Sequence, residues 1–401
     1  MHSGFGMRRA EWVGNCHDEL KKIVKQPSPA SLVGIVANPA SGRDIRRLTS
    51  KALVFPTVEK VNMIERLLGA LGATGVERVM MMPDLVGISA GLTRSIDGHR
   101  ADLDQPWPQV EFLSMRLTQG AGDTAEAVRR MREAGVAVIV VLGGDGTHRI
   151  VAGECADIPL ATLSSGTNNA FPDLREATLT GLAAGLVATA AVAVESAARR
   201  NKRLRVRYGG QEELALVDVC VTRLEHLGAR AVWDPASIAE LYVTFAEPGL
   251  IGLSSIAAMH SPVGREEPRG GWVHCAPTGQ AVLAPIAPGL VRPVGIARAG
   301  VLMPGQAMPI DARRGSIALD GEREIELDGR QAASVTLELN GPLTLDVPAT
   351  LAAAVAAMPS GRSVVSRMTR TGLPSAGASS CTPPLSVSMI CDIESSRAKC
   401  G

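Results

Sequence analysis

Residues 136–147 read VAVIVVLGGDGT, an apolar run of seven residues followed by three glycines within four positions. An apolar run of this length bounded by glycine is typical of a strand that is covered on both faces of a sheet. The glycines let the backbone turn sharply and expose its N–H groups at the end of the strand, where ligands bind in open α/β sheets. A helix beginning near Thr147 would add its positive end. The stretch therefore predicts a strand, an anion-binding turn and a helix, although a plain turn with Asp145 as a helix cap fits the same residues.

Strand and helix patterns alternate on both sides of this stretch. Further apolar runs predict strands at 31–37, 76–82, 110–117 and 159–163, and helical spacing predicts helices at 57–71 and 123–135. Residues 177–194 carry no charge, but alanine, glycine and threonine dilute the apolar run, so a buried helix is favoured over a membrane span. The alternation predicts an α/β domain with a mainly parallel sheet over residues 31–200.

After residue 200, short β-like runs separated by turns replace this alternation. The runs lie at 203–208, 213–221, 271–276, 281–286, 315–320, 323–328, 334–339 and 342–347. They predict a β-rich second domain with antiparallel strands over residues 201–347. Residues 1–30 are interpreted as an N-terminal extension, and residues 348–401 as a short helix followed by a disordered tail rich in small polar residues.

The composition excludes several classes of function. Lys and Arg number 41 against 40 Asp and Glu, and aromatic residues make up 3%, so neither a general attraction to nucleic acid nor a base-stacking surface is predicted. The seven cysteines include no CxxC pair, which argues against a zinc ribbon or a thioredoxin-type site. The first 30 residues contain no apolar signal segment. We therefore expect a cytoplasmic protein with no nucleic-acid partner and no integral membrane association.

Two further polar, glycine-containing loops follow predicted strands. Residues 38–43 read NPASGR after the first strand, and residues 164–169 read SSGTNN after the strand at 159–163. Because the carboxyl ends of parallel strands meet at one edge of a sheet, we expect the three loops to form one phosphate-lined crevice. Neither the Walker A nor the GxGxxG spacing is present. The expected nucleotide-binding residues are Asn38, Pro39, Ser41, Gly42, Gly143, Gly144, Gly146, Thr147, Ser165, Gly166, Thr167, Asn168 and Asn169.

The NPxSG, GGDGT and GTxN motifs together resemble the NAD kinase/diacylglycerol kinase superfamily. The resemblance implies an α/β ATP-binding domain, a β-rich second domain and an active site between them. Weaker similarities continue in the second half: residues 276–279 resemble the TPTG segment of NAD kinases, residues 284–293 their TPI-P…RP segment, and residues 319–322 their acidic hairpin turn. Residues 37–48, ANPASGRDIRRL, most resemble the acetoin catabolism protein X group, which is described as ATP-NAD kinase-like.

The resemblance implies phosphoryl transfer from ATP with Mg²⁺. Asp145 would accept the proton of the attacking hydroxyl group, or hold the metal indirectly through the Mg-nucleotide. Asp218, or the pair Asp320 and Glu322, would supply a second acidic role. A simple acidic hairpin turn also fits Asp320 and Glu322.

Two departures from the family patterns concern the phosphoryl acceptor. NAD kinases carry an Asn-Glu or Asn-Asp pair that holds NAD, whereas this chain has Val217 before Asp218. Lipid kinases read GTxNDFA, and Ala170 stands here in place of the Asp. Three interpretations stay open. The first is a kinase for NAD or another soluble acceptor, and with NAD as the acceptor it would serve NADP biosynthesis. The second is a diacylglycerol-type lipid kinase, and the third is a non-catalytic nucleotide-binding regulator linked to acetoin catabolism. A homo-oligomer is compatible with each.

Other polar segments carry weaker functional hypotheses. Residues 260–271 contain Arg265 and Arg269 and would close over an anionic substrate or form a solvated loop. His148 would touch the nucleotide or lie at the surface. The basic run at 199–207 would form a solvated linker face or steer phosphate.

Overall fold

The computed structural model describes residues 31–41, 51, 55–99, 106–166, 169–225, 231–232 and 234–357. The described residues fall within one compact unit. The predictions for residues 1–30 and 358–401 lie outside the described residues, as do those for Gly42, Thr167 and Asn168.

The first part of the chain forms a seven-stranded, mainly parallel sheet, as predicted. Its strands in spatial order are β3 (Gln109–Phe112), β2 (Arg78–Met81), β1 (Leu32–Ala37), β4 (Val138–Gly143), β5 (Leu160–Ser164), β17 (Leu343–Leu345) and β6 (Ala198–Arg200). Only the β17–β6 pair is antiparallel among these described pairs. The strand order reverses between β1 and β4, and such a reversal leaves a crevice at the carboxyl ends of the two strands.

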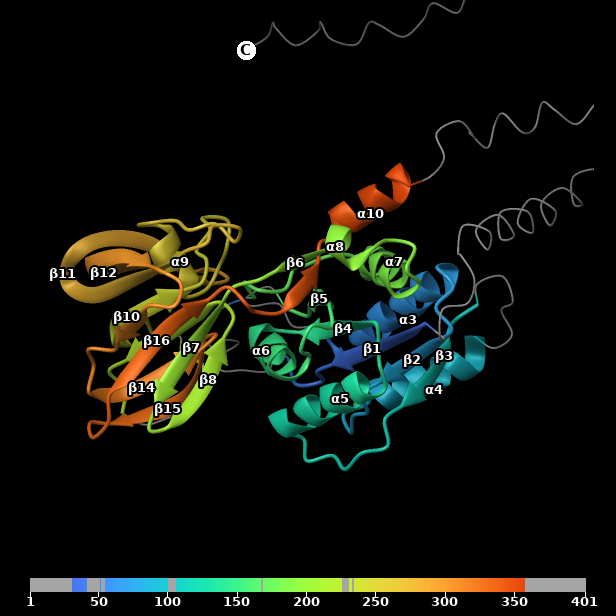
Figure 1. The fold of residues 1–401 in the computed structure, drawn as a ribbon. Helices are drawn as coiled ribbons and strands as arrows, with labels where there is room; N and C mark the ends of the chain where they lie inside the picture. The colour runs from blue at the N-terminus through green and yellow to red at the C-terminus, as the bar shows by residue number, and fades with distance from the viewer. Residues whose placement is uncertain are drawn as a thin grey trace, which may run out of the picture. The chain divides into compact units, whose positions relative to one another are not determined.

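Helices cover both faces of this sheet, as Figure 1 shows. Alternate residues of β1 and β4, such as Ile35 and Val140, share one core with α3 (Thr57–Ala73), α4 (Ile88–His99) and α7 (Ala177–Ala188). The intervening residues, such as Val36 and Val141, share the other core with α5 (Ala121–Glu133) and α6 (Asp145–Glu154). The short α8 (Val194–Ala197) and the later α10 (Val347–Ala356) contact each other, and α10 also contacts α7. Burial on two faces explains why the central strands β1 and β4 are apolar throughout.

The uncharged segment at 177–194 contains the predicted buried helix, which ends at Ala188. Within the described ranges, no helix combines the length and apolar character that a membrane crossing requires.

The later part of the chain forms two antiparallel sheets, which confirms the prediction of a β-rich region. The six-stranded sheet has the order β12 (Leu290–Leu302), β11 (Gly270–Ala287), β10 (Ile238–Val243), β9 (Asp218–Thr222), β14 (Arg314–Leu319) and β15 (Glu322–Asp328). The four-stranded sheet has the order β13 (Ala307–Pro309), β16 (Ala333–Glu338), β7 (Arg203–Tyr208) and β8 (Gln211–Ala215). A 3₁₀ turn, η1 (Pro235–Ser237), and α9 (Ser254–Ala258) connect strands of this region.

Two strand predictions in this region are wrong. The run at 213–221 was expected to be one strand, but it divides into β8 and β9, which belong to different sheets. The break falls at Leu216 and Val217, whose N–H groups bond the carboxylate of Asp320 instead of a neighbouring strand. The run at 342–347 was expected among the strands of the β-rich domain, but its strand β17 joins the first sheet, where it pairs antiparallel with β6 and in parallel with β5.

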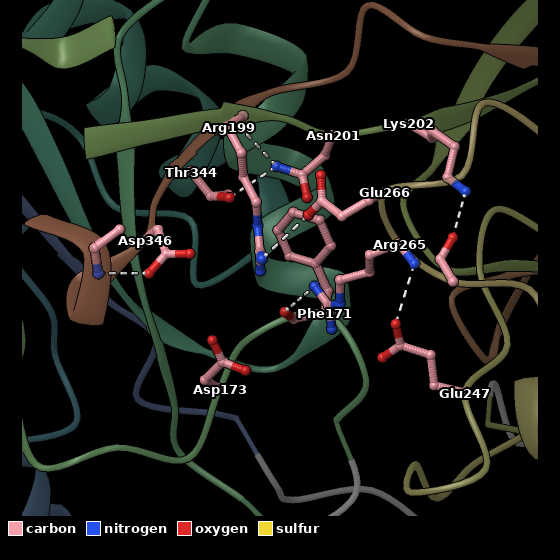
Figure 2. Close-up of polar contacts among 12 residues, drawn as sticks. Phe171, Asp173, Arg199, Asn201, Lys202, Glu247, Arg265, Glu266, Thr344 and Asp346 are labelled. Atoms are coloured by element: carbon pink, nitrogen blue, oxygen red, sulfur yellow. Dashed lines mark hydrogen bonds and ion pairs between the residues drawn. The ribbon is translucent and has the colours of Figure 1, made fainter. Parts of the chain in front are cut away.

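The antiparallel region leaves the parallel sheet and returns to it at one place. It begins after β6 and ends before β17, its antiparallel neighbour. Asn201 and Gly341 lie side by side there, because the Gly341 N–H donates to the Asn201 carbonyl at 2.9 Å. The Asn201 side chain donates to Thr344 Oγ1 at 2.8 Å, a pair visible in Figure 2.

Candidate functional site

The three predicted loops meet at the carboxyl ends of β1, β4 and β5. Asn38 Nδ2 donates to Thr147 Oγ1 at 2.8 Å, which joins the first loop to the start of α6. Ser41 Oγ lies 2.6 Å from Ser165 Oγ, and the Ser165 N–H donates to the Gly143 carbonyl at 3.3 Å. The loops therefore form one connected surface.

This surface is one wall of a cleft of about 670 Å³. The predicted residues that line it are Asn38, Pro39, Ser41, Gly144, Asp145, Gly146, Thr147, Ser165, Gly166, Asn169, Asp320 and Glu322. Gly143 stays in the buried end of β4, and Asp218 faces a different cavity. A volume of this size is typical of small-molecule and cofactor sites.

The glycines of the GGDGT turn are required by close contacts. A Cβ atom on Gly143 would lie 2.6 Å from the Thr147 Cβ, and one on Gly144 would lie 2.8 Å from Asn169 Oδ1. Both distances are too short for real side chains. A larger residue at Gly143 would clash within the turn itself, and one at Gly144 would displace the Asn169 side chain of the third loop.

Acidic residues dominate the charge of the cleft. Its described lining contains one basic residue, Arg149, and seven acidic residues: Asp84, Asp123, Asp145, Glu213, Asp320, Glu322 and Glu324. A polyphosphate would be repelled unless a divalent cation accompanied it. No three His, Cys, Asp or Glu side chains in the described ranges converge as a metal-ligand set. Carboxylate oxygens are ligands that Mg²⁺ prefers, so Asp145 or Glu322 would be able to contact a Mg²⁺ ion that entered together with phosphates.

Asp145 stands at the start of α6, and its carboxylate is held by the third loop. It accepts the N–H of Ala170 at 3.0 Å and the N–H of Phe171 at 2.8 Å. The N-cap position of α6 is Gly144, with no side-chain capping bond. The carboxylate is thus fixed in direction by another loop.

Asp320 occupies the tight turn between β14 and β15, with a left-handed φ of 52°. Its carboxylate accepts N–H groups from Leu216 at 3.0 Å and Val217 at 2.8 Å, and lies 3.8 Å from Arg149 Nε. Burial, together with the negative charge of Asp145, raises the pKa of Asp320 to about 7 against the opposing effect of Arg149. Asp320 is therefore both a residue of an acidic hairpin turn and an acidic residue of the cleft lining.

This pKa predicts a pH-dependent stability. The folded protein holds a proton on Asp320 at pH values where an unfolded aspartic acid, with its ordinary pKa of 3.8, has lost it. The stabilisation that Asp320 contributes is therefore fully present below about pH 4 and is lost as the pH rises towards 7. Over this range the free energy of unfolding should fall by up to about 1.4 kcal/mol per pH unit. Asp320→Asn tolerates the positive φ and removes this titration. Denaturant unfolding across this range should show a flatter profile for the variant, and parallel profiles would contradict the prediction.

A second, small cavity of about 20 Å³ lies on the other side of these carboxyl groups. Asp145 and Asp320 line both cavities, and Asp218 and Ser254 line the second. Ser254 is 1% exposed, and its hydroxyl group has no hydrogen-bond partner within the described part of the chain. The cavity has room for about one water molecule or one hydroxyl group.

Two basic residues that line the cleft or contact its wall, Arg149 and Lys60, were not predicted as site residues from the sequence. Lys60 of α3 is buried, and its Nζ donates to the carbonyls of Asn38 at 2.9 Å and Pro39 at 3.2 Å and to Ser41 Oγ at 2.9 Å. Arg149 of α6 donates to Glu324 Oε1 at 3.0 Å. A lysine on the apolar stripe of an amphipathic helix is a usable sequence signal, since a buried charge needs partners.

The predicted role of His148 is wrong. His148 neither lies at the surface nor lines the cleft: it is fully buried, its Nδ1 lies 2.9 Å from the Gly144 carbonyl, and burial lowers its pKa to about 4. The basic run at 199–207 is only partly a solvated face, because Lys202 is buried and Arg203 Nε lies 2.7 Å from Glu338, whereas the Arg207 side chain is 59% exposed. Residues 276–279, which resemble the TPTG segment, form an irregularity in the β11–β12 hairpin and are not among the residues that line the cleft.

The two departures from the family patterns pack together. Ala170 and Val217 belong to one apolar cluster with Phe171, Leu216 and Phe245. The two positions at which the sequence departs from the NAD kinase and lipid kinase patterns thus form a shared hydrophobic contact.

Two family models cover the chain in succession. The ATP-NAD kinase N-terminal domain matches residues 33–191, and the acetoin catabolism protein X C-terminal domain matches residues 202–340. Acetoin catabolism protein X of Cupriavidus necator is 44% identical over 328 residues, which cover 80% of this chain and 91% of that protein. The chain belongs to the acetoin catabolism protein X family. In this member of the acetoin catabolism protein X family, the three loops at the carboxyl ends of β1, β4 and β5 fall within the kinase-like match, and the second match contains Asp218, Ser254 and Asp320.

Solved structures share a more distant likeness. A diacylglycerol kinase structure from Bacillus anthracis str. Sterne is 12% identical, with a TM-score of 0.33, covering 80% of this chain and 98% of that one. Two other structures from the same organism give TM-scores of 0.37 and 0.40 at 12% and 13% identity, covering 80% and 79% of this chain and 98% of each solved chain.

Proposed function

We propose that this protein binds ATP with Mg²⁺ in the cleft and transfers the terminal phosphoryl group to a hydroxyl group of a soluble acceptor. The observation that carries the proposal is the position of Asp145, which lines both the large cleft and the small cavity. The match to the ATP-NAD kinase N-terminal domain supports the nucleotide side.

The residues present divide the reaction between them. The glycine turn and the positive end of α6 would bind the phosphates, and Mg²⁺ would offset the acidic lining. Asp145 would take the proton of the acceptor hydroxyl as its oxygen bonds to the terminal phosphorus and the bond to ADP breaks. Asp320 and Glu322 would complete the acidic surroundings of the metal.

The small cavity beside Asp145 limits the size of the acceptor group that can reach this carboxylate. Its volume of about 20 Å³ admits a hydroxyl group but no acyl chain, so a soluble acceptor is favoured over a lipid. NAD stays the first compound to test because of the kinase-like match. The apolar cluster of Ala170 and Val217 favours small hydroxyl compounds as the next class.

The same apolar cluster favours a second candidate function. A member that kept its nucleotide loops and lost its acceptor-binding polar groups would bind ATP without turnover and act as a regulator. A relative's name links it to acetoin catabolism, and we extend that pathway to this chain as part of this second proposal.

We expect ATP with Mg²⁺ to raise the melting temperature. Ligand at about 100 times its Kd stabilises a folded protein by about 2.7 kcal/mol. ATP in the presence of EDTA should give a much smaller shift, because the cleft is acidic. Thermal unfolding and calorimetry at millimolar nucleotide measure both conditions, and absence of binding would remove both candidate functions.

The acceptor is then tested by ADP release with NAD, NADH, diacylglycerol and small diols. Turnover with a soluble compound supports the kinase, and turnover with diacylglycerol alone would replace it with the lipid kinase. ATP binding without turnover on an extended acceptor panel would support the regulator.

A further inference from the structure

Arg265 lies in the loop between α9 and β11, yet it points at the loop that holds Asp145 (Figure 2). Its Nη1 donates to the Phe171 carbonyl at 3.1 Å, and its Nη2 donates to the Ala170 carbonyl. The guanidinium group lies 4.1 Å from the ring centre of Phe245 and 5.9 Å from that of Phe171. Both carbonyls and both rings fix the plane of the group.

One peptide group connects Arg265 to Asp145. The Ala170 carbonyl, which accepts from Arg265, belongs to the same peptide as the Phe171 N–H, which donates to Asp145 Oδ1 at 2.8 Å. Hydrogen bonds in such a chain polarise one another, so a cation on the carbonyl strengthens the N–H as a donor. The Ala170 N–H donates to the same carboxylate at 3.0 Å, so two consecutive backbone N–H groups hold Asp145.

The loop that carries Arg265 is itself held in place. Lys202 Nζ donates to the carbonyls of Gly264 at 2.9 Å, Glu267 at 2.7 Å and Arg269 at 2.8 Å. Glu247 accepts the Arg265 N–H at 3.1 Å. These contacts tie the loop down on both sides of Arg265, so the expectation that the arginine closes over an anionic substrate does not fit.

We propose that Arg265 is a positioning residue for Asp145, acting through the peptide group between Ala170 and Phe171. Its effect on turnover rests on the proposed function, whereas the hydrogen-bond chain exists with or without turnover. Charged groups that act on Arg265 are Asp145, Asp173, Arg199 and Glu247. Arg199 pairs with Glu266 on the same loop, as Figure 2 shows.

Arg265→Met tests the chain directly. Hydrogen exchange of the Phe171 amide, followed by NMR on the full chain, should speed up by about 10–100-fold, as expected when a bond supported by a charge is weakened. Arg265→Lys keeps the charge but cannot bond both carbonyls in one plane, so its exchange should be intermediate. Arg269→Met is the matched control, because its side chain pairs with Glu267 at 2.6 Å and leaves the Ala170 and Phe171 carbonyls untouched.

If the kinase is active, Arg265→Met should lower kcat by about 10–100-fold, because misplacing a reacting group by about 1 Å has effects of this size. The KM for ATP should change little. In an Asp145→Asn background the same change should have no further effect on kcat, since coupled residues are non-additive.

Unchanged exchange at Phe171 in Arg265→Met, or an equal increase in Arg269→Met, would overturn the proposal. If Arg265→Met does not fold, the Phe171 amide exchange rate of Arg265→Lys decides in its place. A wild-type exchange rate in Arg265→Lys would count against the proposed hydrogen-bond chain. If no acceptor gives turnover, the kinase proposal fails while the exchange result still decides on Arg265.

Discussion

Asp145→Asn is expected to reduce ATP-dependent turnover by about 10²–10⁴-fold, the usual contribution of a positioned general base. The amide oxygen can still accept the N–H of Phe171, which lies 2.8 Å from the native carboxylate, so the loops should stay joined. The lost capacity to take a proton or to face the metal then accounts for the change. Steady-state ADP release, with ATP affinity measured by calorimetry, separates turnover from binding.

The matched control for this variant is Asp157→Asn. Asp157 pairs with Arg200 at 2.9 Å and its side chain is 83% exposed, so its loss should leave turnover unchanged. Full activity in Asp145→Asn would reduce the GGDGT segment to a structural turn. A large loss of ATP affinity at intact turnover would assign Asp145 to the nucleotide alone.

Lys60→Met should have the largest effect on the fold around the cleft. The change removes a donor from the carbonyls of Asn38, Pro39 and Ser41 and from the Ser41 hydroxyl group. Buried acceptors left without a donor destabilise a protein, and we expect a loss of about 2–5 kcal/mol in the free energy of unfolding. The first loop would also lose its anchor, so ATP affinity should fall. Denaturant unfolding and calorimetry measure the two effects.

Arg66→Met on the same helix serves as the comparison. Arg66 pairs at the surface with Glu59 and Glu176, and exposed pairs of this kind contribute about 0–1 kcal/mol. Equal stability losses in the two variants would mean that the Lys60 contacts add nothing beyond a surface ion pair.

The strands of the parallel sheet were predictable because both of their faces are buried. Their apolar runs are continuous, as in β1 and β4, and glycine or proline marks where many of them stop. The run at 213–221 was not divided correctly, because apolar residues continue through Leu216 and Val217 where the chain passes between sheets. What breaks the strand there is Asp320, about 100 residues later, and local periodicity carries no trace of it.

The candidate site, like the strands, was predictable where local sequence determines it and not where distant residues do. Loops that follow parallel strands must meet, so the residues of this wall of the cleft could be named from the sequence. The contacts of partners that reach the site from elsewhere could not be named. Lys60, on the apolar stripe of a helix, contacts the carbonyls of the first loop, and Arg265, expected over an anionic substrate or in a solvated loop, contacts those of the third. The fully buried state of His148 was equally hidden, since its neighbours in the chain are those of an exposed helix start.

The meeting of Asn201 and Gly341 has an evolutionary consequence. Because the antiparallel region begins and ends at one hydrogen-bonded point, a gene could acquire, lose or exchange it as a single cassette without rerouting the remaining strands. The match to the acetoin catabolism protein X C-terminal domain, residues 202–340, falls between these two residues. The cassette contains four residues described above, which would be inherited together: Asp218, Ser254, Arg265 and Asp320. A lineage could then replace these four residues in one recombination event while the loops that follow β1, β4 and β5 descend unaltered.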